Sequence, residues 1–491
     1  MIEIKDVTYT YNEADQPALE KLSISISKGE CVLLCGKSGC GKSTVTRLLN
    51  GMIPNFYEGK LSGQVLHDGQ AVQDLPMHKI AERVGTVFQN PRTQFYTVNT
   101  TSEIVFGCEN LGMPRRQITE RLRQTAEDLQ IEDLLDRSIF GLSGGEKQIV
   151  AFASVYAMQP EVYVLDEPSA NLDMATVKRL RRSLGLLKQQ GKTIVIAEHR
   201  LFYLRGIFDR AIYMEDGKIR AQYTREDFDS MTQADLERTG LRFMSLTDVP
   251  TRPIALRDKR AVLSVAHLEG YHGKRRALCI ENASFGAGRA YAVIGRNGAG
   301  KSTFAAALCA TLKKASGKCL IDGNELGKRR RLKLSYLVMQ EVNHQIFADS
   351  VATEVTLGSR DSATESGALK LASLLTEMDL AGLENRHPMT LSGGQKQRVI
   401  IASACFSGKK IIILDEPTSG LDYAHMMQTV RLLRRLREEA GFLFVITHDY
   451  EFIAEACDEV IRMDGGRIAE QYPLDEIGIA KLKDFFEIGE S

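Results

Sequence analysis

The chain has 491 residues, of which 43% are hydrophobic and 26% are charged, and its 63 basic residues balance its 63 acidic residues. This length favours two to four domains, and the neutral balance excludes an overall field that would attract nucleic acid or anionic lipid. The nine cysteines show no zinc-ligand spacing, and no apolar run approaches the about 18 residues that cross a bilayer, so we expect a soluble protein with reduced thiols.

The beginning of the chain predicts strands that lead into a phosphate-binding loop. Three strands are expected first, at residues 2–11, 22–26 and 31–36. The pattern GxxxxGKS follows at residues 36–43, and helical sequence continues from Thr44. Its glycines let backbone N–H groups surround a phosphate, while Lys42 can reach the β- and γ-phosphates and the Ser43 hydroxyl can bind Mg²⁺. This pattern indicates a P-loop NTPase.

Two further elements follow the phosphate loop. Gln89 comes after an apolar strand, and residues 102–129 read as helical with a break near Gly112. The sequence LSGG at residues 142–145 opens another helix, which Ser143 is expected to cap. Two glycines at this helix start leave backbone N–H groups open to an anion.

A buried strand at residues 162–166 then delivers two adjacent carboxylates, Asp166 and Glu167. A continuous apolar run of this length is typical of a parallel strand, and ligands bind at the carboxyl edge of parallel α/β sheets. The next strand, at residues 193–197, is followed by Glu198 and His199. We therefore expect Asp166, Glu167 and His199 at the ligand-binding edge of the sheet.

Residues 223–260 lose the apolar periodicity and contain Pro250 and Pro253, so we interpret them as a linker with one helix at 233–239. The predicted domains are accordingly 1–222 and 261–491. The basic run at 328–331 is interpreted as a solvated helix face.

The second half repeats the first. It contains a phosphate loop at 295–302, a glutamine at Gln340, LSGG at 391–394, Asp415 with Glu416, and His448. Ser143 precedes Asp166 by 23 residues, as Ser392 precedes Asp415, and each aspartate precedes its histidine by 33. The stretch from phosphate loop to LSGG is longer in the first half, partly because of residues 52–59. The chemical elements keep their spacing while the connecting segments vary, which indicates duplication.

This order of elements, present twice, resembles the ATP-binding cassette (ABC) ATPases. The resemblance implies an α/β fold of two tandem P-loop NTPase domains, each with a helical subdomain and an antiparallel β subdomain. In that family two cassettes close head to tail around two ATP molecules, so each site joins the phosphate loop of one cassette to the LSGG of the other. Because both halves keep the glutamate and the histidine, we expect both sites to hydrolyse ATP.

The resemblance assigns roles residue by residue. Glu167 and Glu416 are expected to act as general bases, and His199 and His448 to contact the γ-phosphate. Magnesium ligands or organisers are Ser43, Gln89, Asp166, Ser302, Gln340 and Asp415. The ATP-binding residues of the first half are Tyr11, Gly36, Lys37, Ser38, Gly39, Cys40, Gly41, Lys42, Ser43, Thr44, Gln89, Ser143, Gly144 and Gly145. Those of the second half are His272, Gly295, Arg296, Asn297, Gly298, Ala299, Gly300, Lys301, Ser302, Thr303, Gln340, Ser392, Gly393 and Gly394.

Adenine is expected to stack on Tyr11 in the first site. In the second site the matching position falls on Tyr271 or His272, and the sequence does not decide between these two rings.

A narrower resemblance, on residues 49–54, 87–95 and 106–112, is to the ATPases of energy-coupling factor (ECF) importers. It implies a peripheral protein on the cytoplasmic face of the membrane, with a transmembrane scaffold (T-type) subunit docking near Gln89 and Gln340 and a substrate-binding (S-type) membrane subunit. No nucleic acid partner is expected. The second half lacks the Asn-Pro that follows Gln89, so we expect its docking region to differ.

Twin cassettes also occur in soluble ATPases that act on ribosomes or nucleic acid, which is the alternative function, and a non-hydrolysing regulatory module is a third. The first alternative usually brings a long charged linker, an iron–sulfur domain or inserted zinc modules, which this sequence lacks. The solute itself cannot be read from this chain, because specificity would reside in another polypeptide.

Overall fold

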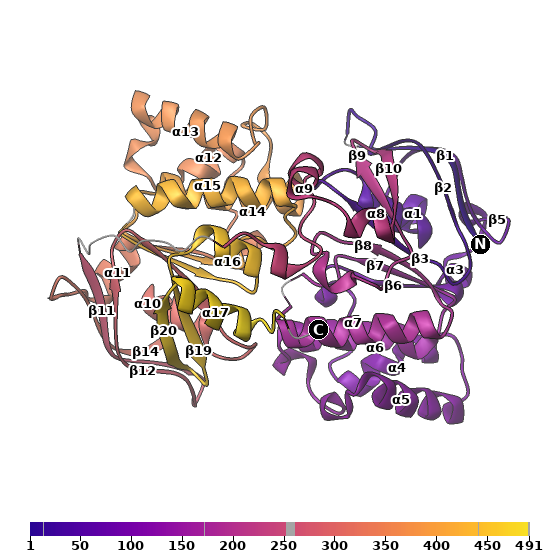
Figure 1. Cartoon of the computed structure of the whole chain (residues 1–491), viewed down its shortest axis with the longest axis horizontal. Coiled ribbons are helices and arrows are strands. Elements are labelled where there is room, and N and C mark those ends of the chain that lie inside the picture. The colour runs from indigo at the N-terminus through magenta and orange to yellow at the C-terminus, as the bar shows by residue number, and fades with distance from the viewer. Residues whose placement is uncertain (13, 171, 252–260, 440, 490–491) are drawn as a thin grey trace. The chain divides into compact units, whose positions relative to one another are not determined.

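The computed structural model describes the chain except for residues 13, 171, 252–260, 440 and 490–491 (Figure 1). The described residues form two compact units, Met1–Ser245 and Leu246–Ser491. The end of the expected linker, 252–260, lies outside the described residues, and the domain limits drawn from the sequence stay a prediction. The expected helix at 233–239 is confirmed.

The core of the first unit is a six-stranded sheet with strand order β10-β9-β3-β8-β7-β6. Five strands run parallel and β10 pairs antiparallel at the edge. Every residue of β3 and β8 is buried, as expected for parallel strands that are covered on both faces. The strands are β3 (Cys31–Gly36), β6 (Val84–Val87), β7 (Val162–Asp166), β8 (Thr193–Ala197), β9 (Arg210–Glu215) and β10 (Lys218–Thr224).

A second, antiparallel sheet in this unit has the order β2-β1-β4-β5. Its apolar side chains share one core with α1 (Lys42–Leu49), the helix that follows the phosphate loop. The strands are β1 (Ile2–Tyr11), β2 (Leu19–Ile26), β4 (Gly59–His67) and β5 (Gln70–Ala71). This is the expected antiparallel β subdomain.

Three helices, α4 (Thr100–Asn110), α5 (Arg115–Leu129) and α6 (Gly144–Met158), pack together as the helical subdomain of the first unit (Figure 1). The break expected near Gly112 is confirmed, because α4 ends before this glycine, whose φ is +69°. The other helices are α2 (Met52–Asn55), α3 (Met77–Arg83), α7 (Met174–Gln189), α8 (Arg225–Asp229) and α9 (Gln233–Thr239). The 3₁₀ helices are η1 (Val72–Asp74), η2 (Pro91–Thr93), η3 (Glu132–Leu134), η4 (Ile139–Gly141) and η5 (Phe202–Leu204).

The segment after β10 packs on the first unit. The Tyr213 hydroxyl, on β9, donates a hydrogen bond to the Thr239 carbonyl at 2.9 Å. The buried Phe228 ring meets the Phe208 ring edge-on at 5.6 Å between centroids. Helices α8 and α9 therefore belong to the core of this unit.

The second unit repeats both sheets, in the orders β20-β19-β13-β18-β17-β16 and β12-β11-β14-β15. The larger sheet contains β13 (Arg289–Ile294), β16 (Ser335–Val338), β17 (Ile411–Asp415), β18 (Phe442–Ile446), β19 (Glu459–Asp464) and β20 (Arg467–Pro473). The smaller sheet contains β11 (Val262–His272), β12 (Arg275–Gly286), β14 (Lys314–Ile321) and β15 (Asn324–Glu325). Strand for strand, this is the topology of the first unit.

Helices α12 to α14 form the second helical subdomain (Figure 1). The second unit passes directly from α10 to β14, whereas the first inserts α2 between α1 and β4, so the expected difference near residues 52–59 is confirmed. The helices are α10 (Lys301–Leu308), α11 (Lys328–Leu334), α12 (Val351–Thr356), α13 (Glu365–Glu377), α14 (Gly393–Phe406), α15 (Tyr423–Glu439), α16 (Tyr450–Ala456) and α17 (Glu476–Phe485). The 3₁₀ helices are η6 (Leu246–Asp248), η7 (Val342–His344), η8 (Arg360–Ala363) and η9 (Pro388–Thr390).

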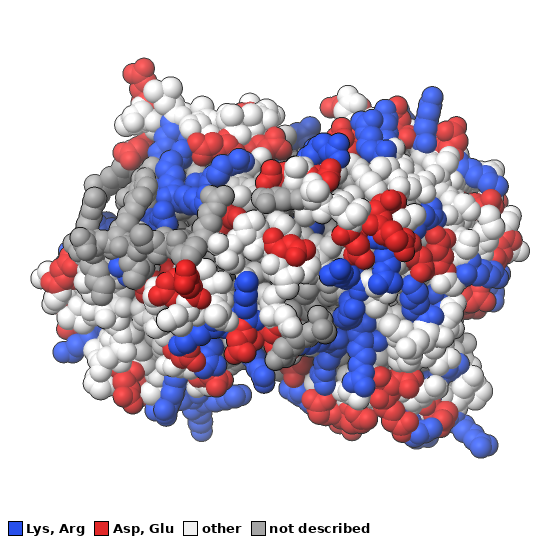
Figure 2. Space-filling model, in the orientation of Figure 1, with Lys and Arg blue, Asp and Glu red and all other residues white. Residues whose placement is uncertain are grey.

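The distribution of charged side chains and the state of the cysteines agree with what the composition predicts. Basic and acidic side chains are interspersed over the face shown in Figure 2. All nine cysteines are free. In the basic run on α11, Lys328, Arg329 and Arg330 are exposed, while Arg331 is half-buried and donates to the Ala307 carbonyl at 3.0 Å. Among the residues that the structure describes, no helix combines the length and the apolar character needed to cross a bilayer.

Candidate nucleotide-binding sites

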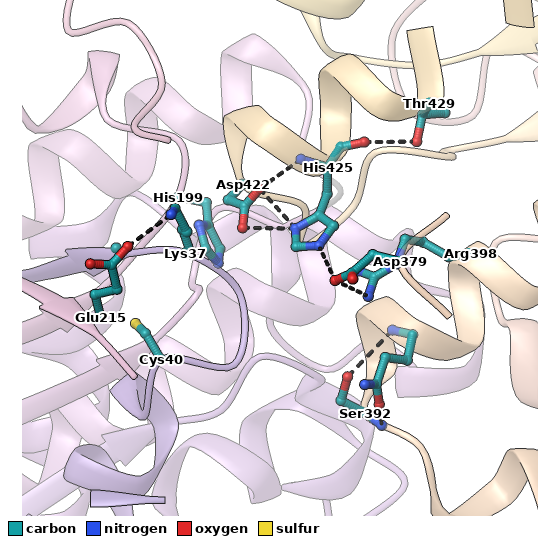
Figure 3. Close-up of polar contacts among 12 residues, drawn as sticks. Lys37, Cys40, His199, Glu215, Asp379, Ser392, Arg398, Asp422, His425 and Thr429 are labelled. Atoms are coloured by element: carbon teal, nitrogen blue, oxygen red, sulfur yellow. Dashed lines mark hydrogen bonds and ion pairs between the residues drawn. The ribbon is translucent and has the colours of Figure 1, made fainter. Parts of the chain in front are cut away.

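The first phosphate loop connects the end of β3 to the start of α1, and its backbone requires glycine. Gly36 has a φ of +139°, and a Cβ there would lie 2.1 Å from the Met214 carbonyl oxygen. The Lys42 ammonium lies across the loop and donates to the carbonyls of Gly36 at 3.0 Å and Lys37 at 3.1 Å. The Lys37 side chain pairs with Glu215 at 2.8 Å (Figure 3). The loop thus concentrates N–H donors and one buried cation at the carboxyl edge of the sheet.

The second phosphate loop has the same construction. Gly295 has a φ of +150°, and a Cβ there would lie 2.4 Å from the Met463 carbonyl oxygen. Lys301 donates to the carbonyls of Gly295 at 2.7 Å and Arg296 at 3.2 Å. The duplication inferred from spacing therefore extends to atomic contacts.

Each loop hydroxyl touches the aspartate that ends the neighbouring strand. Ser43 Oγ donates to Asp166 Oδ1 at 3.0 Å, and Ser302 Oγ donates to Asp415 Oδ2 at 2.9 Å. Burial raises the pKa of both carboxyl groups.

These oxygen atoms fit Mg²⁺, which usually takes one or two carboxylates and completes its shell with water and substrate phosphates. Within the described part of the chain, no cluster of three or more His, Cys, Asp or Glu side chains could hold a metal by itself. A metal at either site would therefore depend on ligands from a nucleotide and from water.

Both candidate bases sit on a strained backbone. Glu167 has a φ of +46° and Glu416 a φ of +52°, a region that non-glycine residues rarely adopt and that is enriched at functional sites. The Glu167 N–H donates to the Ala197 carbonyl at 2.8 Å and the Glu416 N–H to the Ile446 carbonyl at 2.8 Å, which fixes each turn against the adjacent strand.

The first glutamate has two polar partners. Gln89 Nε2 donates to Glu167 Oε2 at 2.6 Å, and His199 Nε2 lies 3.6 Å from Glu167 Oε1. Burial and the neighbouring Asp166 charge raise the pKa of Glu167 to about 8. A carboxyl group whose pKa approaches neutrality is suited to accept a proton from water. Gln89 and His199 thus lie beside the Asp166-Glu167 pair at one edge of the sheet.

The second glutamate is held differently. Thr447 Oγ1 and the His448 backbone N–H donate to Glu416 Oε2 at 3.3 and 3.4 Å, and His448 Nε2 lies 3.8 Å from Glu416 Oε1. Gln340 is exposed, and its side chain forms no hydrogen bond with any residue that the structure describes. The structure therefore brings Gln89, but not Gln340, onto its glutamate.

The proposed adenine positions also correspond. The Tyr11 hydroxyl lies 3.1 Å from Thr44 Oγ1, and His272 Nε2 lies 3.1 Å from Thr303 Oγ1. Tyr271 instead donates its hydroxyl to Glu269 at 2.7 Å. His272 is thus the structural counterpart of Tyr11, and stacking of either ring on adenine stays a prediction.

The LSGG serines each cap the helix they open. Ser143 Oγ accepts from the Glu146 N–H, while the Glu146 carboxylate accepts from the Ser143 N–H at 2.7 Å. Ser392 and Gln395 form the same capping box on α14, seen in part in Figure 3. The expected cap at Ser143 is confirmed, and the box orients the glycine N–H groups that follow.

The aspartate after each carboxylate turn caps the next helix. Asp173 accepts from the Thr176 N–H at 2.9 Å at the start of α7. Asp422 accepts from the His425 N–H at 2.8 Å and also contacts the His425 ring, whose Nε2 lies 3.7 Å from Asp379 (Figure 3). Only the second unit places a histidine at this position.

Residues 89–97 and 340–348, which we call the glutamine loops, have a shared construction that sequence reasoning missed. Gln94 donates to the Thr86 carbonyl and accepts from the Phe88 N–H, and Gln345 bonds in the same way to Leu337 and Met339. The two loops are thus held in the same way, and a difference between the two docking regions stays a prediction.

A buried glutamate anchors each glutamine loop. Glu103 accepts from the N–H groups of Tyr96 and Thr97, and Glu354 accepts from those of Phe347 and Ala348. In each half this glutamate comes nine residues after the bonded glutamine, a spacing that comparison of the two halves could have revealed.

The fold, the two phosphate loops and the paired carboxylates define a nucleotide-hydrolysing protein built from two cassettes. The ABC transporter family matches residues 19–170 and 281–419, and the chain belongs to this family. The family hydrolyses ATP, so the chain is an ABC-type ATPase.

Several known proteins are similar over nearly the whole chain. A Treponema denticola protein assigned to the ABC transporter ATP-binding proteins is 44% identical, covering 96% of this chain and 97% of its own. The Bacillus subtilis protein YkoD, assigned to HMP/thiamine import, is 31% identical, covering 94% of this chain and 89% of its own. A structure of ribosome-bound archaeal Pelota and ABCE1 shares the fold, with a TM-score of 0.70 at 22% identity, covering 98% of this chain and 80% of that one.

Proposed function

We propose that the chain is the ATP-hydrolysing subunit of an ECF-type membrane importer. It would couple ATP binding and hydrolysis to uptake of a small solute through separate transmembrane subunits. The observation that carries the proposal is the pair of glutamine loops, each anchored by a buried glutamate and each presenting an exposed aromatic ring. Similarity to YkoD, whose assignment is import of HMP or thiamine, supports the direction of transport.

The exposed rings suit protein contact. Tyr96 is 77% exposed and stacks on Phe106 at 5.3 Å between centroids, and Phe347 at the equivalent position is 78% exposed. Phe140 is also largely exposed in the first unit. Aromatic rings on a surface are favoured at protein interfaces. We infer that the T-type subunit contacts these rings, which would hold the chain at the cytoplasmic face of the membrane.

The two ATP sites would be composite. The first would join Lys42 and Glu167 of the first unit to Ser392 of the second, and the second site would join Lys301 and Glu416 to Ser143. Ser43 with Asp166, and Ser302 with Asp415, would hold Mg²⁺, which neutralises charge on the phosphates. Glu167 and Glu416 would accept the proton of the attacking water, while His199 and His448 would contact the γ-phosphate.

Vitamins, their precursors and metal ions are the candidate solutes, and an S-type membrane subunit would select among them. ATP-driven closure of the two cassettes and opening after hydrolysis would move the T-type subunit.

Isolation from detergent-solubilised membranes tests the proposal. The tagged full chain should retain membrane proteins, and the variant Tyr96→Ala/Phe347→Ala should lose them while keeping its ATPase activity. Ile477→Ala, which removes an equally exposed apolar side chain from α17, is the matched control and should retain them. Recovery of ribosomal RNA in place of membrane proteins would contradict the proposal and favour the ribosome-acting alternative.

A further inference from the structure

Glu198 is a buried carboxylate in the first unit to which the reaction scheme gives no role. It directly precedes His199, is 2% exposed and lies at the carboxyl end of β8. Its Oε1 accepts from the Ser169 N–H at 3.2 Å, from the Ser169 hydroxyl and from the Tyr203 hydroxyl at 2.8 Å. Its Oε2 accepts from the His199 N–H at 2.9 Å. We call this set the Glu198 clasp.

The clasp connects two segments that carry proposed catalytic groups. Ser169 lies two residues after Glu167, in the turn that leaves β7, and His199 lies two residues after the end of β8. A carboxylate is unfavourable in the interior unless donors satisfy it, and backbone or hydroxyl donors reach both of these oxygens. The clasp therefore fixes the turn after Glu167 against the backbone of His199.

The second unit achieves the same connection with other residues. Thr447 stands where the first unit has Glu198, and its hydroxyl donates to Glu416 itself at 3.3 Å. The connection to the turn is made by Thr418, whose hydroxyl donates to Asp449 Oδ2 at 2.9 Å. Thr418 and Asp449 occupy the positions of Ser169 and Arg200.

Because Thr447 stands in place of Glu198, the catalytic glutamates of the two units accept hydrogen bonds from different groups. A carboxylate that accepts on both oxygens has no hydrogen to offer its neighbour, so Glu198 cannot replace the donor that Thr447 supplies to Glu416. Glu167 instead accepts from the Gln89 side chain at 2.6 Å, on the first glutamine loop.

We propose that Glu198 is a positioning residue of the first ATP site. It aligns Glu167 with His199, while the Glu167 carboxylate accepts its side-chain hydrogen bond from Gln89. The two sites of one chain then hold their bases by different means. In the first site the base accepts a hydrogen bond from the glutamine loop, and in the second it accepts hydrogen bonds from Thr447 and His448, directly after β18. The inference rests on the proposed role of Glu167.

Site-resolved turnover tests it. The full chain is trapped with vanadate and 8-azido-ATP, and the photolabelled peptides show which unit retained nucleotide. Glu198→Gln keeps the shape but presents an amide NH₂ to one of the two backbone N–H groups. We expect it to lower first-site trapping by about 10- to 100-fold, the loss that a misplaced catalytic group produces, with KM for ATP and second-site trapping little changed.

A rescue experiment uses the residues that the second unit has at these positions. The triple variant Ser169→Thr/Glu198→Thr/Arg200→Asp installs the residues of the second unit and should recover most of the first-site trapping lost in Glu198→Thr alone. In this triple variant Gln89→Ala should cost less than it does in the wild-type chain, because the new threonine donates to Glu167. If Glu198→Gln does not fold, Tyr203→Phe, which removes one donor to Oε1, should give a smaller loss of the same kind.

The results separate this inference from the site assignment. Wild-type trapping in Glu198→Gln, or an equal loss in both sites with a lowered unfolding temperature, would overturn the positioning role. A triple variant that folds like wild type but traps no better than Glu198→Thr would overturn it as well. Glu167→Gln is measured alongside, and normal first-site turnover in that variant would remove the basis of the inference by refuting the role of Glu167.

Discussion

Glu167 and Glu416 both adopt the left-handed backbone conformation, at equivalent turns of the two units. Strained residues of this kind cluster at functional sites. If each is the base of its site, Glu167→Gln/Glu416→Gln should lower phosphate release by about 10²- to 10⁴-fold, the range that general-base catalysis contributes, while ATP binding persists. Phosphate release and nucleotide retention on a spin column measure both effects. Glu325→Gln, an exposed change on β15, serves as control, and wild-type turnover in the double variant would refute the assignment.

His67 on β4 gives a prediction about stability. It is 4% exposed, both ring nitrogens lack a hydrogen-bond partner among the described residues, and burial with the nearby Arg83 charge lowers its pKa to about 4. Because the unfolded pKa is about 6.5, the unfolded chain binds the proton first, so stability falls as the pH drops from about 6.5 toward 4.

Replacing this histidine with an apolar side chain should remove that loss. We expect His67→Leu to gain about 2 kcal/mol over wild type on going from pH 7.5, where both states are neutral, to pH 5. Urea unfolding of the first unit at the two pH values measures the difference. An equal difference between variant and wild type at both pH values would show that His67 is protonated in the folded state.

Among the elements, the glutamine loops depend on one buried side chain each. Glu103→Ala should leave the N–H groups of Tyr96 and Thr97 without their acceptor, at a cost of about 1–3 kcal/mol for each unsatisfied group. Hydrogen exchange should then accelerate at residues 94–97 while residues 345–348, held by Glu354, exchange as in wild type. Acceleration in both loops, or in neither, would contradict the local role of Glu103.

The periodic elements of this chain could be predicted, and their side-chain contacts largely could not. The strand at 162–166, the loop at 36–43 and the cap at Ser143 follow from burial patterns and short-range backbone chemistry that act within a few residues. Glu103 and Glu198 were missed because a lone glutamate in the sequence gives no sign of burial, and Glu198 also binds Ser169 from the distant turn after β7.

The second glutamine loop also shows that a short motif does not predict side-chain contacts. Its missing Asn-Pro suggested a different docking region, which stays a prediction, but Gln345 and Glu354 hold this loop with the same four hydrogen bonds that Gln94 and Glu103 make in the first loop. Comparing the two halves position by position, rather than motif by motif, would have recovered this.

For the whole molecule, the central question is how two cassettes of one chain cooperate. Covalent connection raises the effective concentration of each unit around the other, so composite sites would form without a second polypeptide. Each unit contains a complete phosphate loop, carboxylate pair and LSGG helix, and the composite scheme assigns each LSGG helix to the phosphate loop of the other unit. Head-to-tail closure therefore predicts that a change in one unit damages the ATP site of the other.

Ser392→Asp is the sharpest variant for this purpose. Aspartate caps helices as well as serine does, so α14 should stay intact, but its negative charge would face the ATP phosphates across the composite site. Vanadate trapping of 8-azido-ATP should fall in the site that contains Lys42 more than in the site that contains Lys301, and Ser143→Asp should give the reverse. Loss confined to the unit that carries the substitution would mean that each LSGG serves its own phosphate loop, and the composite-site scheme would have to be abandoned.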